Sequence, residues 1–227
     1  MPTPDAPALR LVPTWTANAE AWTRAVRDGG IPSRRAGTDA AVVEAVVSGL
    51  PPGGRVLDVG CGEGWLVRAL GALGATAHGV DVSEPLVRAA EAGGGGTFAA
   101  LDYDEAAESP ARLGGPYDAA VFNFSLLGER VVGVLAAARR QLEAGGRVVV
   151  QTAHPVAAGP PYADGWREET FADFEGDFTP MPWYFRTFGS WVRVLDAAGL
   201  RLAEAKEPVH PETGAPLSLL LVAEPVG

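Results

Sequence analysis

The fold is decided by a stretch of eleven residues, VLDVGCGEGWL, at Val56–Leu66. It begins as an apolar run typical of a buried strand, and its alternate glycines predict a tight turn that a ligand can approach closely. A helix is expected from about Gly64 to Leu73. Such a helix points its unpaired N–H groups and the positive end of its dipole at the turn. The stretch therefore predicts a small-molecule site.

Strands and helices alternate after this turn. Short apolar runs predict strands at 76–80, 97–101, 117–123 and 147–152, with helices at 84–92 and 129–143 between them. Two further strands are expected at 200–205 and 217–223. Continuous apolar strands are typical of a parallel sheet covered on both faces. The pattern predicts an α/β fold with a doubly wound, mostly parallel seven-stranded sheet and right-handed crossovers.

The two segments that flank this alternation differ from it. Residues 1–13 are rich in proline and predict an irregular segment, followed by a helix from Thr14 and a second helix capped by Thr38. Residues 153–186 show no periodicity and are too long for an ordinary connection. We expect one domain over 1–227, with a helical cap at 1–50, an insert at 153–186 and a helix that Ser190 caps.

Composition excludes several classes of function. The net charge is −10, so phosphate backbones are repelled and no nucleic-acid partner is expected. Cys61 is the single cysteine, which excludes an internal disulfide and any multi-cysteine metal site. The sequence shows neither a signal peptide nor an apolar run of roughly 18 residues. We therefore expect a cytoplasmic protein with no membrane partner and no metal.

Two classes of ligand are bound by a strand, a glycine turn and a helix: dinucleotides and S-adenosylmethionine. The dinucleotide fingerprint G-x-G-x-x-G/A has a small third residue, which lets the helix pack closely on the strand. Gly60 and Gly62 fit this pattern, but Trp65 occupies the third position. The bulk of Trp65 disfavours a pyrophosphate site.

The pattern Asp58-x-Gly60-x-Gly62-x-Gly64 resembles motif I of the class I S-adenosylmethionine-dependent methyltransferases, types 11 and 12 above all. The likeness extends from 56 to 152 and includes the strand-four motif at 117–124. It implies S-adenosylmethionine as cofactor and S-adenosylhomocysteine as product. It also implies that Asp81 binds the ribose hydroxyls and that Asp102 lies near the adenine amino group.

We predict a cofactor site from the motif residues and their flanks. Arg35 is included as a partner for the methionine carboxylate, although a surface role fits it equally well. Two of these residues have an alternative interpretation without a cofactor: Asp102 could belong to a solvated loop, and Asp58 could stabilise only the turn. The predicted cofactor contacts are Arg35, Asp58, Gly60, Cys61, Gly62, Asp81, Val82, Leu86, Asp102, Tyr103, Asn123, Phe124 and Ser125.

The methyl acceptor is expected to lie under the insert. His154 directly follows strand five, where it would act as a general base or else hydrogen-bond the backbone before Pro155. Aromatic rings suit a flat or apolar acceptor, although single rings also serve to anchor an insert. The predicted acceptor contacts are Trp22, Tyr162, Trp166, Trp183, Tyr184 and Arg186. Arg186 would bind an acceptor carboxylate or pair with Glu168 or Glu169.

These inferences predict methyl transfer from S-adenosylmethionine to a small molecule, at oxygen ahead of nitrogen or carbon. The alternatives are an NAD-dependent oxidoreductase and a non-catalytic S-adenosylmethionine-binding protein. A monomer and a homodimer both fit the sequence, which does not identify the acceptor.

Overall fold

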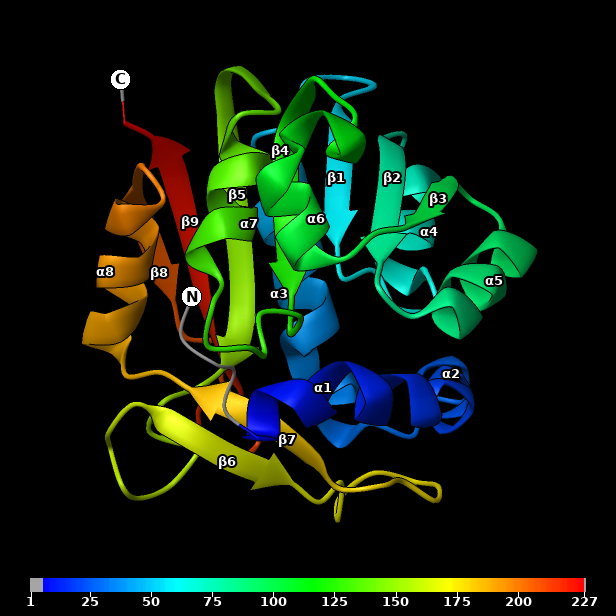
Figure 1. Ribbon diagram of the computed structural model, residues 1–227, viewed down its shortest axis with the longest axis vertical. Coiled ribbons are helices and arrows are strands. Elements are labelled where there is room, and N and C mark those ends of the chain that lie inside the picture. Colours follow the sequence, from blue (N-terminus) through cyan, green and yellow to red (C-terminus); the bar gives the residue numbers. More distant parts are fainter. Residues whose placement is uncertain (1–5, 227) are drawn as a thin grey trace.

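The computed structural model describes residues 6–226 and is built around a seven-stranded sheet with the strand order β3-β2-β1-β4-β5-β9-β8 (Figure 1). Neighbouring strands from β3 to β5 run parallel, and β9 is antiparallel to both β5 and β8. The strands are β1 Arg55–Val59, β2 Thr76–Asp81, β3 Thr97–Ala100, β4 Tyr117–Asn123, β5 Leu142–Ala153, β8 Leu200–Lys206 and β9 Ser218–Pro225. The predicted doubly wound, mostly parallel sheet is confirmed.

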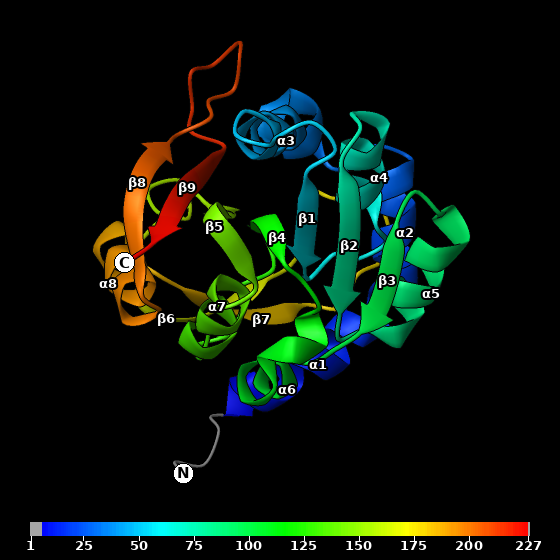
Figure 2. The same cartoon turned by 90° about the horizontal axis from the view of Figure 1, so that it is seen from above.

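Helices cover the sheet on both faces (Figure 2). One face carries α3 (Asp39–Val47) and α4 (Trp65–Ala72), with α5 (Glu84–Gly93) beside β3, and the other carries α6 (Tyr103–Glu108), α7 (Val132–Arg139) and α8 (Phe188–Ala197). β4 shows why its sequence is continuously apolar. Ala119 and Val121 pack in the core on one face of the sheet, whereas Ala120 and Phe122 pack in the core on the other.

The N-terminal segment differs from the prediction. Residues 1–5 of the expected irregular segment lie outside the described residues, but Ala6–Ala17 forms helix α1 with Pro13 inside it, and Ala19–Arg27 forms α2. A proline inside a helix removes one backbone hydrogen bond, which is why local sequence argued against a helix here. α1 lies against β7, so tertiary packing outweighs this local cost.

Thr38 occupies the predicted N-cap position of α3, but its backbone angles are helical because the turn Arg34–Thr38 runs directly into α3, and its hydroxyl makes no cap hydrogen bond. The cap predicted at Ser190 is wrong. α8 begins at Phe188, and its N-cap is Thr187 rather than Ser190. The Thr187 hydroxyl accepts a hydrogen bond from the Ser190 N–H, as an N-cap does from the third helical residue.

The insert contains regular structure that its sequence does not reveal. β6 (Gly165–Glu169) and β7 (Met181–Phe185) pair in an antiparallel hairpin, apart from the main sheet. The helix expected at 129–143 is shorter, since residues 142–143 belong to β5. Among residues 6–226, no helix is both long and apolar enough to cross a membrane.

Candidate active site

A cavity of about 570 Å³ lies at the carboxyl ends of the parallel strands. In Figure 1 the arrowheads of β1 and β4 point toward α1 and β7, the elements that face this edge of the sheet. Chain order reverses between β1 and β4, and in open α/β sheets ligands bind beside such a switch point. The cavity is lined by the glycine turn, by the residues that follow β2, β3 and β4, by α1 and α2, and by the β6–β7 hairpin.

The glycine turn is fixed to the end of β2. The N–H groups of Gly60 and Cys61 both donate to the Val80 carbonyl, at 2.7 and 3.0 Å. Gly60 has φ +80°, and a Cβ atom there would lie 2.3 Å from the Cβ of Ser125. Only glycine meets both conditions, because other residues rarely adopt this backbone conformation and would collide with Ser125.

Asp81 ends β2 and holds the turn from the second side. Its two carboxylate oxygens accept hydrogen bonds from the N–H groups of Gly62, at 2.9 Å, and Ser83, at 2.8 Å. Burial raises the pKa of Asp81 to about 6, and these two hydrogen bonds oppose that rise. A carboxylate oxygen has more than one acceptor position, so Asp81 retains capacity for ligand hydroxyl groups.

Asp58 carries a buried polar atom without a described hydrogen-bond partner in the cavity lining. Its side chain is buried, and its Oδ1 atom has no hydrogen-bond partner among the described residues. Burial, with a smaller contribution from the charge of Asp81, raises the pKa of Asp58 to about 8. A buried carboxyl without a partner is costly, and a cationic ligand would remove that cost.

The loops after β3 and β4 complete the polar half of the cavity. Asp102 caps α6 by accepting a hydrogen bond from the Asp104 N–H at 2.7 Å, while it also lines the cavity. The Tyr103 and Ser125 hydroxyls both donate to the Val59 carbonyl, at 3.4 and 2.6 Å. Burial raises the pKa of Tyr103 well above its usual value, so this hydroxyl remains neutral.

The structure brings most of the predicted cofactor residues together. Those that line the cavity are Asp58, Gly60, Cys61, Gly62, Asp81, Val82, Asp102, Tyr103, Asn123, Phe124 and Ser125. Leu86 lies outside the lining because its side chain is fully buried in α5. Phe124 has φ +52°, a strained conformation for a bulky residue, where the chain leaves β4 for the cavity wall.

Arg34, rather than the predicted Arg35, lines the cavity. Its guanidinium lies 4.2 Å from the Trp65 ring centroid and donates from Nε to Asp39 at 2.9 Å. Arg35 instead donates to the Gly29 carbonyl. The sequence gives no reason to prefer one of two adjacent arginines. The helical turn at Arg34–Thr38 decides which of the two side chains lines the cavity.

His154 does not line the cavity either. Its Nε2 atom lies 2.8 Å from a Glu207 carboxylate oxygen, and its Nδ1 atom accepts a hydrogen bond from the Val156 N–H at 3.3 Å. With both ring nitrogens engaged, His154 has no free lone pair for a substrate proton. The alternative role, a hydrogen bond to the backbone around Pro155, is the one the geometry supports.

The predicted acceptor residues divide into two groups. Trp22, Trp166 and Trp183 line the cavity, together with Trp15, Phe171, Phe174, Met181 and Glu169, which were not among the predicted contacts. Tyr162, Tyr184 and Arg186 lie outside the lining.

The three excluded residues have contacts elsewhere. The Tyr162 side chain is exposed, and its hydroxyl accepts a hydrogen bond from the Phe188 N–H at 3.1 Å. Arg186 donates to the carbonyls of Gly128 and Glu129, at 2.7 and 2.6 Å, and its guanidinium lies 4.9 Å from the Tyr184 ring centroid. Arg186 thus holds the loop after β4 through its backbone, from outside the cavity lining. It binds neither Glu168 nor Glu169 in the structure.

Comparison with known proteins agrees with this geometry. A family model described as a methyltransferase domain matches residues 35–205, about three quarters of the chain. A search of curated proteins found no match. Among solved structures, the chain is similar to an S-adenosylmethionine-dependent methyltransferase from Mesorhizobium loti, at 25% identity and a TM-score of 0.59, over 80% of this chain and 97% of that one.

Two further structures share the fold. A magnesium protoporphyrin IX methyltransferase from Synechocystis PCC 6803 with bound S-adenosylmethionine has 20% identity and a TM-score of 0.65, over 99% of each chain. A glycopeptide N-methyltransferase complexed with sinefungin has 18% identity and a TM-score of 0.64, over 85% of this chain and 87% of that one.

Fold and family model together define a class I S-adenosylmethionine-dependent methyltransferase. The chain belongs to the methyltransferase domain family. The resemblance inferred from the sequence is confirmed, and the chain is a methyltransferase rather than an NAD-dependent oxidoreductase or a non-catalytic binding protein.

Proposed function

We propose that the cavity binds S-adenosylmethionine in its polar half and a flat, largely apolar small molecule in its aromatic half, and that the methyl group passes to an oxygen of that molecule. The observation that carries the proposal is the juxtaposition of Asp58, with its unpartnered oxygen, and the glycine turn at Gly60–Gly62 in a single cavity with the aromatic rings. The single-domain organisation, with a cap at 1–50 and an insert at 153–186, belongs to the same proposal.

The charges of the lining suit a cationic cofactor. Both arginines of the lining are already paired, Arg34 with Asp39 at 2.9 Å and Arg130 with Asp104 at 3.0 Å. Among the described lining residues there is no lysine or histidine, whereas five further carboxyl groups remain: Asp58, Asp81, Asp102, Glu129 and Glu169. Such a lining favours the ammonium and sulfonium charges of S-adenosylmethionine and repels a dinucleotide pyrophosphate.

Each polar residue has a role that follows from its position. Asp58 would receive the ammonium group, Asp81 the ribose hydroxyls and Asp102 the adenine amino group, while the backbone at Gly60 and Gly62 lets the cofactor approach. Arg34 would take the role expected of Arg35, because it lines the cavity, donates to Asp39 from Nε, and could offer its Nη groups to the methionine carboxylate.

The aromatic half would position the acceptor and exclude water. Methyl transfer is an in-line displacement, in which the protein mainly aligns the acceptor atom with the methyl group supplied by the bound cofactor. Trp166, Trp183 and Phe171 line this half of the cavity, and aromatic rings suit contact with a flat molecule. The net charge of −10 continues to favour a small molecule over nucleic acid as the acceptor.

Glu169 replaces His154 as the candidate general base. It ends β6 and lines the cavity, and its Oε1 atom accepts a hydrogen bond from the Phe171 N–H at 2.8 Å. This contact orients the carboxylate while its second oxygen is available to take the proton of a hydroxyl acceptor.

A panel of phenols, amines and carboxylic acids with planar rings tests the proposal. With S-adenosylmethionine present, we expect S-adenosylhomocysteine to form with the phenols, and kcat/KM for the acceptor to fall about tenfold in Trp183→Ala, the loss of about 1.4 kcal/mol of ring contact. Tyr162→Ala, an exposed ring outside the cavity, is the matched control. Turnover with the amines alone would contradict oxygen methylation, and equal turnover by the two variants would contradict the acceptor position.

The pH dependence of cofactor affinity tests the role of Asp58. Its pKa of about 8 means that the carboxyl carries a proton at neutral pH in the ligand-free protein. A bound cation favours the ionised form, so binding releases a proton, and affinity rises with pH between about 6 and 7.5, by up to tenfold per unit. Calorimetry with S-adenosylhomocysteine, whose ammonium group is retained, measures the slope. Asp58→Asn should leave only the weaker dependence near pH 6 that comes from Asp81, whose pKa is about 6, and equal slopes in the two proteins would refute the assignment.

A further inference from the structure

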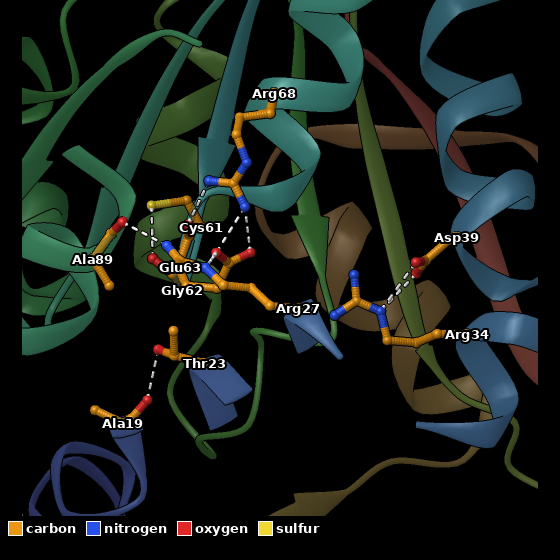
Figure 3. Close-up of polar contacts among 10 residues, drawn as sticks. All are labelled: Ala19, Thr23, Arg27, Arg34, Asp39, Cys61, Gly62, Glu63, Arg68 and Ala89. Carbon is orange, nitrogen blue, oxygen red and sulfur yellow. Dashed lines mark hydrogen bonds and ion pairs between the residues drawn. The ribbon is translucent and has the colours of Figure 1, made fainter. Parts of the chain in front are cut away.

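The side chain of Glu63 projects from the glycine turn into the protein rather than into the cavity. It is fully buried, and both of its carboxylate oxygens accept hydrogen bonds from Arg68 Nη2 of α4, each at 2.7 Å (Figure 3). Arg68 Nη1 also donates to the Glu63 carbonyl at 2.8 Å. One arginine therefore already neutralises the buried Glu63 from within the α/β core.

A second arginine reaches the same carboxylate from the cap. Arg27, the last residue of α2, donates from Nε to Glu63 Oε2 at 2.9 Å and from Nη2 to the Ala89 carbonyl of α5 at 2.9 Å (Figure 3). Its side chain is 44% exposed, whereas that of Glu63 is 0% exposed. Arg27 thus joins α2 to both the glycine turn and α5.

The same helix places an aromatic ring over the cofactor site. Trp22 of α2 lines the cavity, and its indole nitrogen lies 3.4 Å from where a Cβ atom at Gly62 would be. Trp22 also contacts Trp15 and Phe174, with ring centroids 4.9 and 6.1 Å apart. Glu63 and Gly62 are adjacent, so the ion pair and the covering ring act on neighbouring residues of one turn.

We propose that the Arg27–Glu63 ion pair is a latch that holds α2 and Trp22 closed over the cofactor, and that Arg27 is a positioning residue that sets cofactor residence time from outside the cavity. The asymmetry of the contacts makes the latch reversible. When α2 moves away, the half-exposed Arg27 returns to water and Glu63 remains paired with Arg68, so that opening leaves no buried charge uncompensated. The inference rests on the proposed cofactor position at Gly60–Gly62.

The variant Arg27→Gln tests the latch, and Arg24→Gln is its matched control. Arg24 lies on the same helix, and its ion pair with Glu20 is exposed to solvent and remote from the turn. We expect Arg27→Gln to raise the dissociation rate of S-adenosylhomocysteine and the KM for S-adenosylmethionine about tenfold, the loss of one charge-assisted contact, while kcat changes less than twofold. Arg24→Gln should match the wild type, and Arg27→Lys, which keeps the charge, should restore part of the loss.

Amide hydrogen exchange of residues 19–27 in the ligand-free protein separates this inference from the proposed function. Faster exchange in Arg27→Gln than in Arg24→Gln supports the latch even if the wild type binds no S-adenosylhomocysteine, a result that would refute the cofactor site alone. Equal exchange in the two variants overturns the latch. If the wild type binds S-adenosylhomocysteine, and Arg27→Gln exchanges faster but releases the ligand at the wild-type rate, the link between the latch and the cofactor is overturned.

Discussion

Replacing Gly60 with alanine is expected to lower affinity for S-adenosylhomocysteine more than 100-fold, which corresponds to more than about 2.7 kcal/mol. The left-handed backbone at Gly60 costs an alanine roughly 1–2 kcal/mol. In addition, the new Cβ atom would lie 2.3 Å from the Cβ of Ser125, so the turn or the loop after β4 must move. Isothermal calorimetry measures the affinity, and thermal unfolding should show a Tm lower by several degrees.

Gly53→Ala is the control that separates strain from close approach. Gly53 also has a positive φ, +72°, but a Cβ atom there would meet nothing within 4 Å. This variant should lose a similar backbone contribution to stability and keep its affinity for S-adenosylhomocysteine. If Gly60→Ala binds as tightly as Gly53→Ala, then the close approach of the turn to Ser125 is not what shapes the cofactor site.

Replacing Asp81 with alanine is expected to weaken S-adenosylhomocysteine binding by about 1–3 kcal/mol, or roughly five- to 150-fold. The variant leaves the N–H groups of Gly62 and Ser83 without their acceptor and removes the proposed partner of the ribose hydroxyls. Asp104→Ala is the control, because Asp104 lines the cavity as an exposed carboxylate paired with Arg130. It removes the same charge without touching the turn.

An analogue of S-adenosylhomocysteine that lacks both ribose hydroxyls makes the assignment to Asp81 specific. The wild type should bind this analogue more weakly than the parent compound, whereas Asp81→Ala should bind the two with nearly equal affinity, because the interacting partner is already absent. If the loss of affinity caused by the variant and the loss caused by the analogue simply add, Asp81 does not contact the ribose hydroxyls.

The centre of the sheet was predictable because strands such as β1 and β4 are buried on both faces and therefore read as continuous apolar runs. β4 has the predicted bounds, and the strand ends bring Asp58, Asp81 and Asp102 to one edge, as parallel topology requires. Helix boundaries were less predictable. Thr187 and Ser190 are both residues that favour the N-cap position, so the sequence does not decide between them, and the helix through Pro13 depends on packing against β7, which no local pattern encodes.

Side-chain direction limited the prediction of the site. Arg34 and Arg35 are equivalent in sequence, and the backbone turns only Arg34 into the cavity. His154 was expected at the open edge because it follows β5, but Glu207, 53 residues further along the chain, holds its ring. The acceptor side depends on the register of the β6–β7 hairpin, where Trp166 pairs with Tyr184 and Arg167 with Trp183, and the sequence of the insert has no periodicity that shows this register.

The measurement that tests the central claim most directly is a calorimetric titration of the purified chain with S-adenosylhomocysteine and, separately, with NAD. The acidic lining, the unpartnered oxygen of Asp58 and the bulk of Trp65 predict that one S-adenosylhomocysteine binds per chain and that NAD gives no binding heat. Binding of NAD together with no binding of S-adenosylhomocysteine would contradict the assignment of the cavity to a methyltransferase cofactor.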